Sequence, residues 1–295
     1  MVYLIDASVY IFRAWYALAP EQRDADGNPT HALYGFARFL GDLIERRTPR
    51  YLAVAFDESH GSGHRHALLP RYKANREPAP PELRRQFALC REYCRHLGVA
   101  EFASSSYEAD DLIGTLAAGA RTAGLRVTVV TRDKDLAQLV GRGDRFWDYS
   151  DAAEYAYDDI AGRFGVAPER MADYLALTGD AVDNIPGVPG IGPKTAAALM
   201  GRYASLEELY EDLERVACLP LRGAARLPEK LREHREAAYL ARALTRIHCD
   251  APLGVDTEAL RRRGPALAEL GAFCERHGFG AMLPRQAERI ARLAA

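Results

Sequence analysis

The sequence predicts an α/β fold in which a mostly parallel sheet is flanked by helices and is followed by a helical region. Three short runs of aliphatic and β-branched residues, VYLID (2–6), YLAVAF (51–56) and RVTVVT (126–131), have the composition of buried strands. Amphipathic helical patterns separate these runs, as in residues 33–44. Strands that alternate with helices are typical of a parallel sheet covered on both faces.

Further elements are predicted along the chain. A helix is expected near 81–97, a short strand at VAEF (99–102) and a helix that starts within YEADDLIGTL (107–116). Another helix is expected near 168–178. The remainder of the chain, from 201 onward, has a helical pattern of mixed charge.

The composition is that of an ordinary globular protein. The chain has 295 residues, of which 48% are hydrophobic and 27% charged, and its formal net charge is −2. It has no run of about 18 apolar residues and no basic-then-apolar leader, because Asp6 interrupts the apolar opening. Its five cysteines are odd in number and scattered, as expected of reduced thiols. We therefore expect a cytoplasmic protein with no membrane partner.

Acidic residues stand at the ends of the predicted strands. Asp6 ends the first strand and Asp57 follows the second. Asp133 follows the third, with Asp135 two residues on. Sites in open α/β sheets form beyond the carboxyl ends of the strands, so we expect these acids to converge on one edge of the sheet.

The stretch YEADD (107–111) places Glu108, Asp110 and Asp111 at the start of a predicted helix. Acidic side chains suit the first turn of a helix, because the helix dipole is positive there. Three like charges nevertheless repel one another unless they are solvated or face a cation. Taken alone, this stretch leaves a solvated helix start and a metal site as equal alternatives.

Nine acids could reach one cleft: Asp6, Asp57, Glu108, Asp110, Asp111, Asp133, Asp135, Asp180 and Asp183. Carboxylates without accompanying His or Cys favour Mg²⁺ or Mn²⁺. Two such ions about 4 Å apart suit the in-line hydrolysis of a phosphodiester, because one activates water and both stabilise the attacking and leaving oxygens.

Basic and glycine-rich segments accompany these acids. Between His64 and Arg85, six Lys or Arg residues stand against two acids. GVPGIGPKTAAAL (187–199) has the form of a helix-hairpin-helix, in which glycine amides can approach a phosphate and Lys194 adds charge at the next helix start. An ordinary helix-helix loop is the alternative for this stretch. Together these segments imply a nucleic-acid substrate.

Four motifs together resemble the structure-specific 5′ nucleases, the family of the 5′→3′ exonuclease domain of bacterial DNA polymerase I and of the flap endonucleases. These motifs are YEADD, TRDKDLAQL (131–139), GDAVDNIPGVPGIGPKTA (179–196) and RYKANR (71–76). The resemblance runs in family order from about residue 2 to about residue 200. It implies a PIN-like 5′ nuclease core over 1–165 with a helical arch at about 60–85. It also implies a helical DNA-binding region over 166–295, with the helix-hairpin-helix at about 187–200.

The resemblance implies an activity and a set of metal ligands. The expected enzyme is a monomeric 5′→3′ exonuclease or 5′-flap endonuclease, which uses two Mg²⁺ or Mn²⁺ ions on DNA with 5′ flaps, nicks or ends in replication or repair. The positions that match the first metal group are Asp6, Asp57, Glu108, Asp110 and Asp111, and those that match the second are Asp133, Asp135, Asp180 and Asp183.

The resemblance also assigns catalytic and DNA-binding residues. Arg13 matches a basic residue near the scissile phosphate, and Lys73 and Arg76 match the base of the arch through which a 5′ single strand passes. Lys73 and Arg76 lie three residues apart, so on a helix they would share a face and could grip adjacent phosphates. The expected DNA contacts are Tyr72, Gly187, Gly190, Gly192 and Lys194, and a K⁺ ion is an option on the hairpin carbonyls.

Two side chains in this basic segment have competing interpretations. Tyr72 is expected either to pack against the arch or to stack on a flap base. Arg65 is expected to be a solvated charge on a helix face rather than a substrate contact.

The sequence departs from the family pattern at two positions. Ala7 stands where the family usually has Gly, and Arg132 precedes Asp133 where a small residue is typical. These departures leave the rate and the metal preference open. No polymerase module is present in the sequence, so we expect any coupling to DNA synthesis to involve a separate polymerase.

Two alternative functions remain open. A PIN-type ribonuclease would share an acidic cleft but would not need the hairpin or the arch segment. A catalytically silent branched-DNA-binding protein would keep the basic segments while losing acids.

Overall fold

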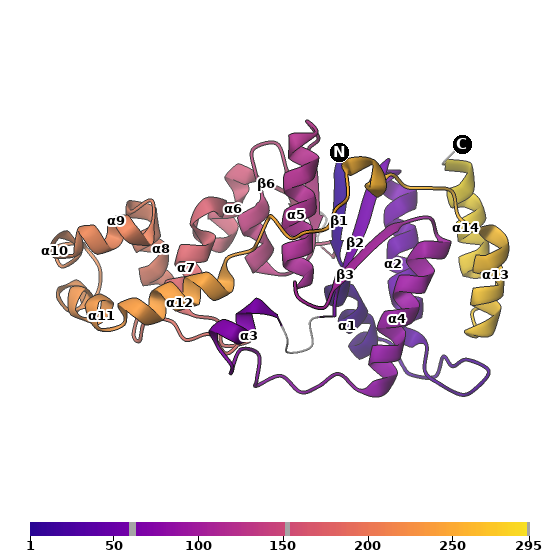
Figure 1. Cartoon of the computed structure of the whole chain (residues 1–295), viewed down its shortest axis with the longest axis horizontal. Helices are drawn as coiled ribbons and strands as arrows, with labels where there is room; N and C mark the ends of the chain where they lie inside the picture. Colours follow the sequence, from indigo (N-terminus) through magenta and orange to yellow (C-terminus); the bar gives the residue numbers. More distant parts are fainter. Residues whose placement is uncertain (59–62, 151–153, 294–295) are drawn as a thin grey trace.

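The computed structural model describes residues 1–58, 63–150 and 154–293. A six-stranded sheet in the order β3-β2-β1-β4-β5-β6 forms the centre of one half of the molecule (Figure 1). Its strands are β1 (Val2–Asp6), β2 (Tyr51–Asp57), β3 (Ala100–Ser104), β4 (Val127–Val130), β5 (Arg145–Trp147) and β6 (Tyr155–Ala156). The first five pair in parallel, and β6 pairs antiparallel with β5. The predicted class is therefore confirmed.

Helices cover both faces of the sheet. Successive side chains of a strand point to opposite sides, so each face presents apolar side chains that pack against helices. α5 (Ala109–Thr122) packs on the face that includes Leu4 and Val129. The opposite face packs against α1 (Ala7–Ala17), α2 (His31–Arg47) and α4 (Pro81–His96). In α2 the residues Leu33, Phe36, Leu40 and Ile44 follow the helical period and are all fully buried.

The segment predicted as a helical arch, about 60–85, is only partly helical. α3 spans His64–Leu68, residues 70–75 form turns, and α4 begins at Pro81. Prolines at 70, 78, 80 and 81 prevent one continuous helix, because each lacks an amide donor and disfavours helical backbone before it. Residues 59–62 of this segment lie outside the described residues.

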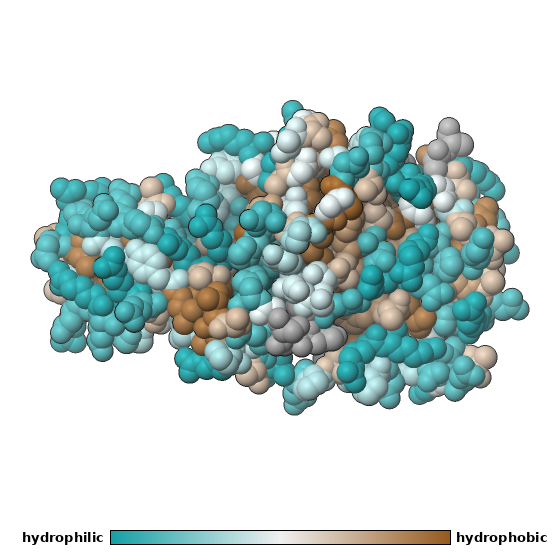
Figure 2. All heavy atoms as spheres, viewed as in Figure 1, coloured by the Kyte–Doolittle hydropathy of each residue, from teal (hydrophilic) through white to brown (hydrophobic). Residues whose placement is uncertain are grey.

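A lobe of short helices extends from the α/β half (Figure 1). It contains α6 (Tyr157–Phe164), α7 (Met171–Thr178), α8 (Pro193–Arg202), α9 (Leu206–Glu211), α10 (Leu213–Val216), α11 (Leu227–Glu233) and α12 (Arg235–Thr245). Short 3-10 helices occur at η1 (Lys134–Leu139), η2 (Pro168–Arg170), η3 (Ala224–Arg226) and η4 (Thr257–Leu260). The lobe has its own core, which includes Leu175, Leu199 and Leu244. Its surface is largely hydrophilic in the view of Figure 2.

The last two helices return to the α/β half. α13 (Leu267–Arg276) and α14 (Met282–Leu293) pack against α4 and α2, on the far side of the sheet from the lobe (Figure 1). Phe273, Leu283 and Ile290 belong to the same buried cluster as Phe36. This packing departs from the prediction of one helical DNA-binding region over 166–295. The apolar stripe of α14 would otherwise remain in water.

The described residues contain no helix with the length and apolar character needed to cross a bilayer.

We expect Ile290→Ala to destabilise the whole α/β half, because Ile290 is fully buried in the core that α2 forms with the sheet. Removing such a side chain typically costs about 2–5 kcal/mol of unfolding free energy. Urea unfolding measures the loss. The matched control is Glu288→Ala, which changes an exposed residue of the same helix and should stay within about 0.5 kcal/mol. Equal effects of the two changes would contradict this packing.

Candidate active site

Three neighbouring strands carry acidic side chains to one edge of the sheet. β1 ends at Asp6, β2 ends at Asp57, and Asp133 follows β4. Since β2, β1 and β4 are adjacent, the predicted convergence is confirmed for these three acids. Burial raises the pKa of Asp6 to about 7, and the neighbouring charges of Asp133 and Asp57 contribute to the rise. A hydrogen bond from Thr131 Oγ1 to Asp6 Oδ2, at 3.0 Å, partly offsets this repulsion.

The start of α5 faces the same edge. Glu108 caps the helix, and Asp110 and Asp111 lie in its first turn. Burial raises the pKa of Asp110 well above its ordinary value, and the charges of Asp133, Asp6 and Glu108 raise it further. Asp110 and Glu108 therefore belong to the cluster. Asp111 Oδ2 also accepts a hydrogen bond from the Glu108 amide at 3.2 Å, so helix capping accounts for one of the three acids.

A second set of acids lies on η1 and on the turn after α7. Burial raises the pKa of Asp135 to about 7. The charge of Asp133 is the next largest cause, and the charges of Asp180 and Asp183 raise the pKa further. Lys134 Nζ lies 2.7 Å from Asp180 Oδ2. Although burial opposes it, this hydrogen bond lowers the pKa of Asp180.

Eight of the nine predicted acids are thus linked by their charges at one edge: Asp6, Asp57, Glu108, Asp110, Asp133, Asp135, Asp180 and Asp183. We call these residues the acid cluster.

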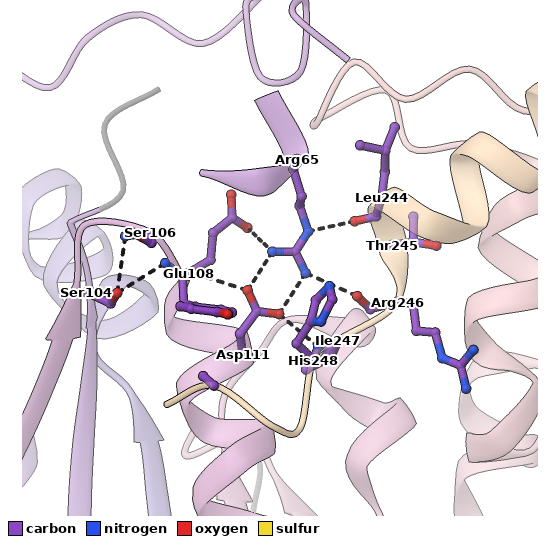
Figure 3. A network of polar contacts seen from close by, with 12 residues as sticks. Arg65, Ser104, Ser106, Glu108, Asp111, Leu244, Thr245, Arg246, Ile247 and His248 are labelled. Carbon is purple, nitrogen blue, oxygen red and sulfur yellow. Dashed lines mark hydrogen bonds and ion pairs between the residues drawn. The ribbon is translucent and has the colours of Figure 1, made fainter. Parts of the chain in front are cut away.

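Asp111, which the family resemblance places in the first metal group, is bound by Arg65. Its side chain is fully buried. Arg65 donates to both of its oxygens, Nη1 to Oδ2 at 2.7 Å and Nη2 to Oδ1 at 2.8 Å (Figure 3). The His248 amide donates to Oδ1 at 2.9 Å. Although burial opposes it, the bonds from Arg65 lower the pKa of Asp111, so this carboxylate is fully engaged within the protein.

Arg65 is buried rather than solvated, with 3% of its surface exposed. Besides Asp111 it contacts the end of α12, where Nε donates to the Leu244 carbonyl at 2.8 Å and Nη2 to the Arg246 carbonyl at 3.2 Å. No local pattern in the sequence indicates this role, because every partner of the Arg65 side chain named here lies at least 43 positions away.

Three cations lie among the acids. Lys73 Nζ is 2.9 Å from Glu108 Oε2 and 3.9 Å from Asp183 Oδ2, and Arg76 also pairs with Asp183. The third cation is Lys134, described above. Eight carboxylates against three cations leave a large excess of negative charge.

Lys73 and Arg76 converge on Asp183 through a turn, so the predicted shared helix face is wrong. Lys73 has a φ of 53°, outside the right-handed helical region. Hydrogen bonds join the turn to the loop after α7, among them Lys73 N to Asp183 O at 3.0 Å, Asn75 Nδ2 to Ala181 O at 2.9 Å and Asn184 Nδ2 to Arg71 O at 2.7 Å. The arch base is therefore held against the loop that carries Asp180 and Asp183.

Tyr72 does not offer a stacking surface, because only 3% of it is exposed. Its hydroxyl donates to Glu108 Oε2 at 3.0 Å and lies 3.3 Å from Asp183 Oδ2. Its predicted role as a DNA contact is therefore corrected to that of a buried support for the acids.

The remaining basic positions lie at the surface. Arg13 is exposed, and its Nη1 donates to Ser150 Oγ at 3.0 Å. Arg132 Nε lies 3.0 Å from Asp148 Oδ2. The side chain of Arg132, which departs from the family pattern, therefore pairs with a nearby acid.

A cleft of about 370 Å³ opens beside the acids. Its lining combines acids, cations and apolar side chains: Asp57, Glu58, Glu108, Lys73, Arg76, Arg84, Ser8, Phe12, Ala79, Phe87 and Ala88. Cations that can meet phosphates and apolar surface that can meet bases thus share one cleft.

The segment between α7 and α8 contains the residues of the predicted hairpin. A Cβ at Gly187 would collide with the backbone of Thr178 and Gly179, so glycine is needed for this close approach. Gly190 has a φ of 80°, and Gly192 caps α8. Lys194 is exposed in the first turn of α8.

The donor set suits a hard divalent cation. Among the described residues, no group of three or more Asp, Glu, His or Cys side chains is arranged to hold an ion as it stands. The acid cluster nevertheless supplies oxygen donors only. Its raised pKa values reflect burial and, after it, repulsion between neighbouring carboxylates, and a bound cation would stabilise their charged forms. Asp135 Oδ1 is buried without a hydrogen-bond partner, although Lys134 Nζ lies 3.4 Å away.

Curated relatives of the chain include two DNA polymerases I. That of Rhizobium leguminosarum is 40% identical over 276 residues, which cover 90% of this chain and 26% of that protein. The thermostable enzyme of Thermus filiformis is 39% identical over 282 residues, which cover 96% of this chain and 32% of that protein. The chain thus spans less than a third of the length of these relatives.

Solved structures share the fold over nearly the whole chain. T5 5′-exonuclease, in a structure with bound zinc ions, has a TM-score of 0.69 at 18% identity and is matched over 100% of this chain and 99% of that one. The catalytic core of Rad2, in a complex with a DNA substrate, has a TM-score of 0.63 at 16% identity over 99% of this chain and 91% of that one.

Two family models match consecutive parts of the chain. Residues 1–165 match the 5′-3′ exonuclease N-terminal resolvase-like domain, and residues 166–268 match the 5′-3′ exonuclease C-terminal SAM fold. Because the first model alone covers more than half of the residues, the chain belongs to the 5′-3′ exonuclease family.

Proposed function

We propose that this chain is a divalent-metal-dependent 5′→3′ exonuclease and 5′-flap endonuclease, which hydrolyses phosphodiester bonds near the 5′ ends of DNA in replication or repair. The observation that carries this proposal is the acid cluster beside a cationic turn and a helix-hairpin-helix. The proposed substrates are DNA molecules with 5′ flaps, nicks or free ends, bound by one copy of the chain. A DNA substrate agrees with the cytoplasmic location expected from the sequence, and with functional coupling to a DNA polymerase.

Two Mg²⁺ or Mn²⁺ ions are the proposed cofactors. Asp6, Asp57, Glu108 and Asp110 would hold one, and Asp133, Asp135, Asp180 and Asp183 the other. When bound, such ions lower the pKa of a water nucleophile and stabilise the attacking and leaving oxygens of the phosphodiester. Asp111 is left out of this set, because Arg65 and two backbone amides occupy its carboxylate.

Lys73, Arg76 and Arg13 are the proposed phosphate-facing cations. Lys73 and Arg76 line the cleft and pair with Glu108 and Asp183, so each can exchange a carboxylate for a phosphate oxygen. Cations fixed beside the reacting phosphate stabilise the charge that develops in the transition state. Arg13 is exposed on α1, the helix that begins directly after Asp6.

The hairpin is the proposed contact for the duplex. Gly187, Gly190 and Gly192 allow the backbone to approach a phosphate, Lys194 adds a cation, and a K⁺ ion on the hairpin carbonyls would bridge to the DNA. Only three residues separate Asp183 from Gly187. The duplex contact and two of the proposed metal ligands, Asp180 and Asp183, therefore lie on one short stretch of chain, which limits how far the bound duplex can lie from the site of cleavage.

A gel assay on a 5′-flap, a nicked duplex and a blunt duplex tests the proposal. We expect cleavage near the 5′ end with Mg²⁺, no cleavage in excess EDTA, and recovery when Mg²⁺ or Mn²⁺ is restored. A single-stranded RNA of matched length is the control. Preferential cleavage of the RNA would favour the PIN-type ribonuclease, and binding of the flap without cleavage would favour the silent DNA-binding protein.

The stability that Asp6 contributes to the metal-free protein should fall as pH rises from about 4 to about 7. The pKa of Asp6 is raised to about 7 in the folded protein from an ordinary value of 3.8, so the folded state holds a proton that the unfolded state has released. The stabilisation from this proton is complete below about pH 4 and is lost as pH rises through about 7. Carboxylates with lowered pKa values, such as Asp111 and Asp180, titrate below this window.

Urea unfolding in EDTA at pH 5, 6, 7 and 8 measures this dependence. The matched variant is Asp6→Asn, which keeps the hydrogen-bonding shape without the charge and should show a shallower fall. Parallel curves for the two proteins would refute the assignment of a raised pKa to Asp6.

Lys73→Ala and Arg76→Ala should slow cleavage far more than they weaken duplex binding. Removing one donor that acts in the transition state typically costs about 10²- to 10³-fold in rate, whereas losing one ordinary phosphate contact reduces the salt slope of binding by about 1. Single-turnover rates at saturating enzyme, paired with flap binding at two salt concentrations, separate these effects. A loss confined to affinity would make both residues anchors for the DNA.

A further inference from the structure

A buried ion pair joins three parts of the chain that are distant in sequence. Arg65 comes from α3, Asp111 from the first turn of α5, and the carbonyls of Leu244 and Arg246 from the end of α12. Figure 3 shows the Arg65 guanidinium between the Asp111 carboxylate and these two carbonyls. Four of its hydrogen bonds go to these groups, at 2.7–3.2 Å.

The segment from the last residues of α12 onward, residues 244–251, is here called the connector. It lies against α5 through two further hydrogen bonds, from the His248 amide to Asp111 Oδ1 and from the Ala251 amide to Thr115 Oγ1, both at 2.9 Å. Gly114 permits this approach, because a Cβ there would lie 2.7 Å from the His248 carbonyl oxygen. The connector is therefore fitted closely to the first two turns of α5.

The connector also contacts η1, which carries Asp135. Gln138 Nε2 donates to the Thr245 carbonyl at 2.9 Å, and the Ile247 amide donates to Gln138 Oε1 at 3.2 Å. One segment of the lobe is thus hydrogen-bonded to two of the elements that carry members of the acid cluster, α5 and η1.

We propose that Arg65 is a positioning residue that acts through Asp111 to hold Glu108 and Asp110 in place for catalysis. This proposal rests on the proposed function. Arg65 is too deeply buried to contact DNA. Its Nη1 lies 3.6 Å from Glu108 Oε2, and Asp111, which it holds, accepts a hydrogen bond from the Glu108 amide. Fixing Arg65 therefore fixes both the backbone and the side chain of Glu108.

The geometry requires arginine and not simply a positive charge. The guanidinium presents planar donors that bind a carboxylate in two places and still reach the two carbonyls, whereas a lysine ammonium lacks this fork. Reacting groups must be held within a fraction of an ångström, so a lost fork should reduce the rate while the DNA-binding surface stays intact.

The test compares Arg65→Lys, Asp111→Asn and the double variant in the full chain. The control pair is Arg121→Lys and Asp144→Asn, which changes an ion pair at the other end of α5, where Arg121 is half-buried, Asp144 is buried and Arg121 Nε lies 2.8 Å from Asp144 Oδ2. Each protein is measured for its thermal unfolding, its flap affinity, its single-turnover rate at saturating enzyme and the Mg²⁺ concentration that gives half of that rate.

We expect Arg65→Lys and Asp111→Asn each to lower the saturated rate about 10- to 100-fold, the range typical of groups that orient metal ligands, with flap affinity within about twofold. The double variant should lose no more than the worse single variant, because the two residues act as one unit. The control variants should keep the wild-type rate. Thr115→Val removes a connector hydrogen bond and no charge, so it should give a smaller loss of rate. This variant replaces Arg65→Lys in the test if Arg65→Lys does not fold.

Three results would overturn the proposal. If only Asp111→Asn needs a higher Mg²⁺ concentration to reach half of its saturated rate, Asp111 is a metal ligand. Weaker flap binding by Arg65→Lys at an unchanged saturated rate would make Arg65 a DNA anchor. Equal losses of rate in the Arg65 and Arg121 variants would make the pair a purely structural one. A wild-type protein that cleaves no DNA would instead refute the proposed function.

Discussion

Mutual repulsion among eight carboxylates is the constraint on which the rest of this structure depends. Acids brought so close destabilise one another's charged forms, and this repulsion adds to burial in raising the pKa values of Asp6, Asp110 and Asp135. Separate elements hold the acids in place. The sheet positions three of them, the start of α5 positions two, η1 positions Asp135, and the turn after α7 positions two more. Lys73, Arg76 and Lys134 neutralise part of the charge.

The acids that lie at strand ends could be predicted from the sequence because topology alone decides their place. In a parallel sheet, strand direction and strand order bring the residues after β1, β2 and β4 together whatever their side chains do. The same holds for the hairpin, since its glycines are required by local backbone geometry at Gly187 and Gly190. Features decided by local backbone rules were therefore accessible before the structure was known.

The side chains that were misplaced are those whose surroundings come from far along the chain. Asp111 and Asp110 are adjacent and chemically identical, yet one meets Arg65 and the other meets the acid cluster. Helical periodicity predicts that adjacent side chains point in different directions, but it does not predict which residues they contact. Tyr72 was misjudged for the same reason, because its burial depends on Glu108 and Asp183. The return of α13 and α14 to the α/β half is a long-range contact of the same kind.

Because these two helices return to the α/β half, the chain crosses twice between that half and the lobe. The chain leaves the sheet after β6, builds the lobe, and comes back through the connector to the core beneath α2 and α4. The lobe is also packed directly against the α/β half, because its buried cluster includes Phe146 of β5 and Ala137 of η1. A force on the lobe therefore acts on the sheet and on the segment that carries Asp135, and not on the connector alone.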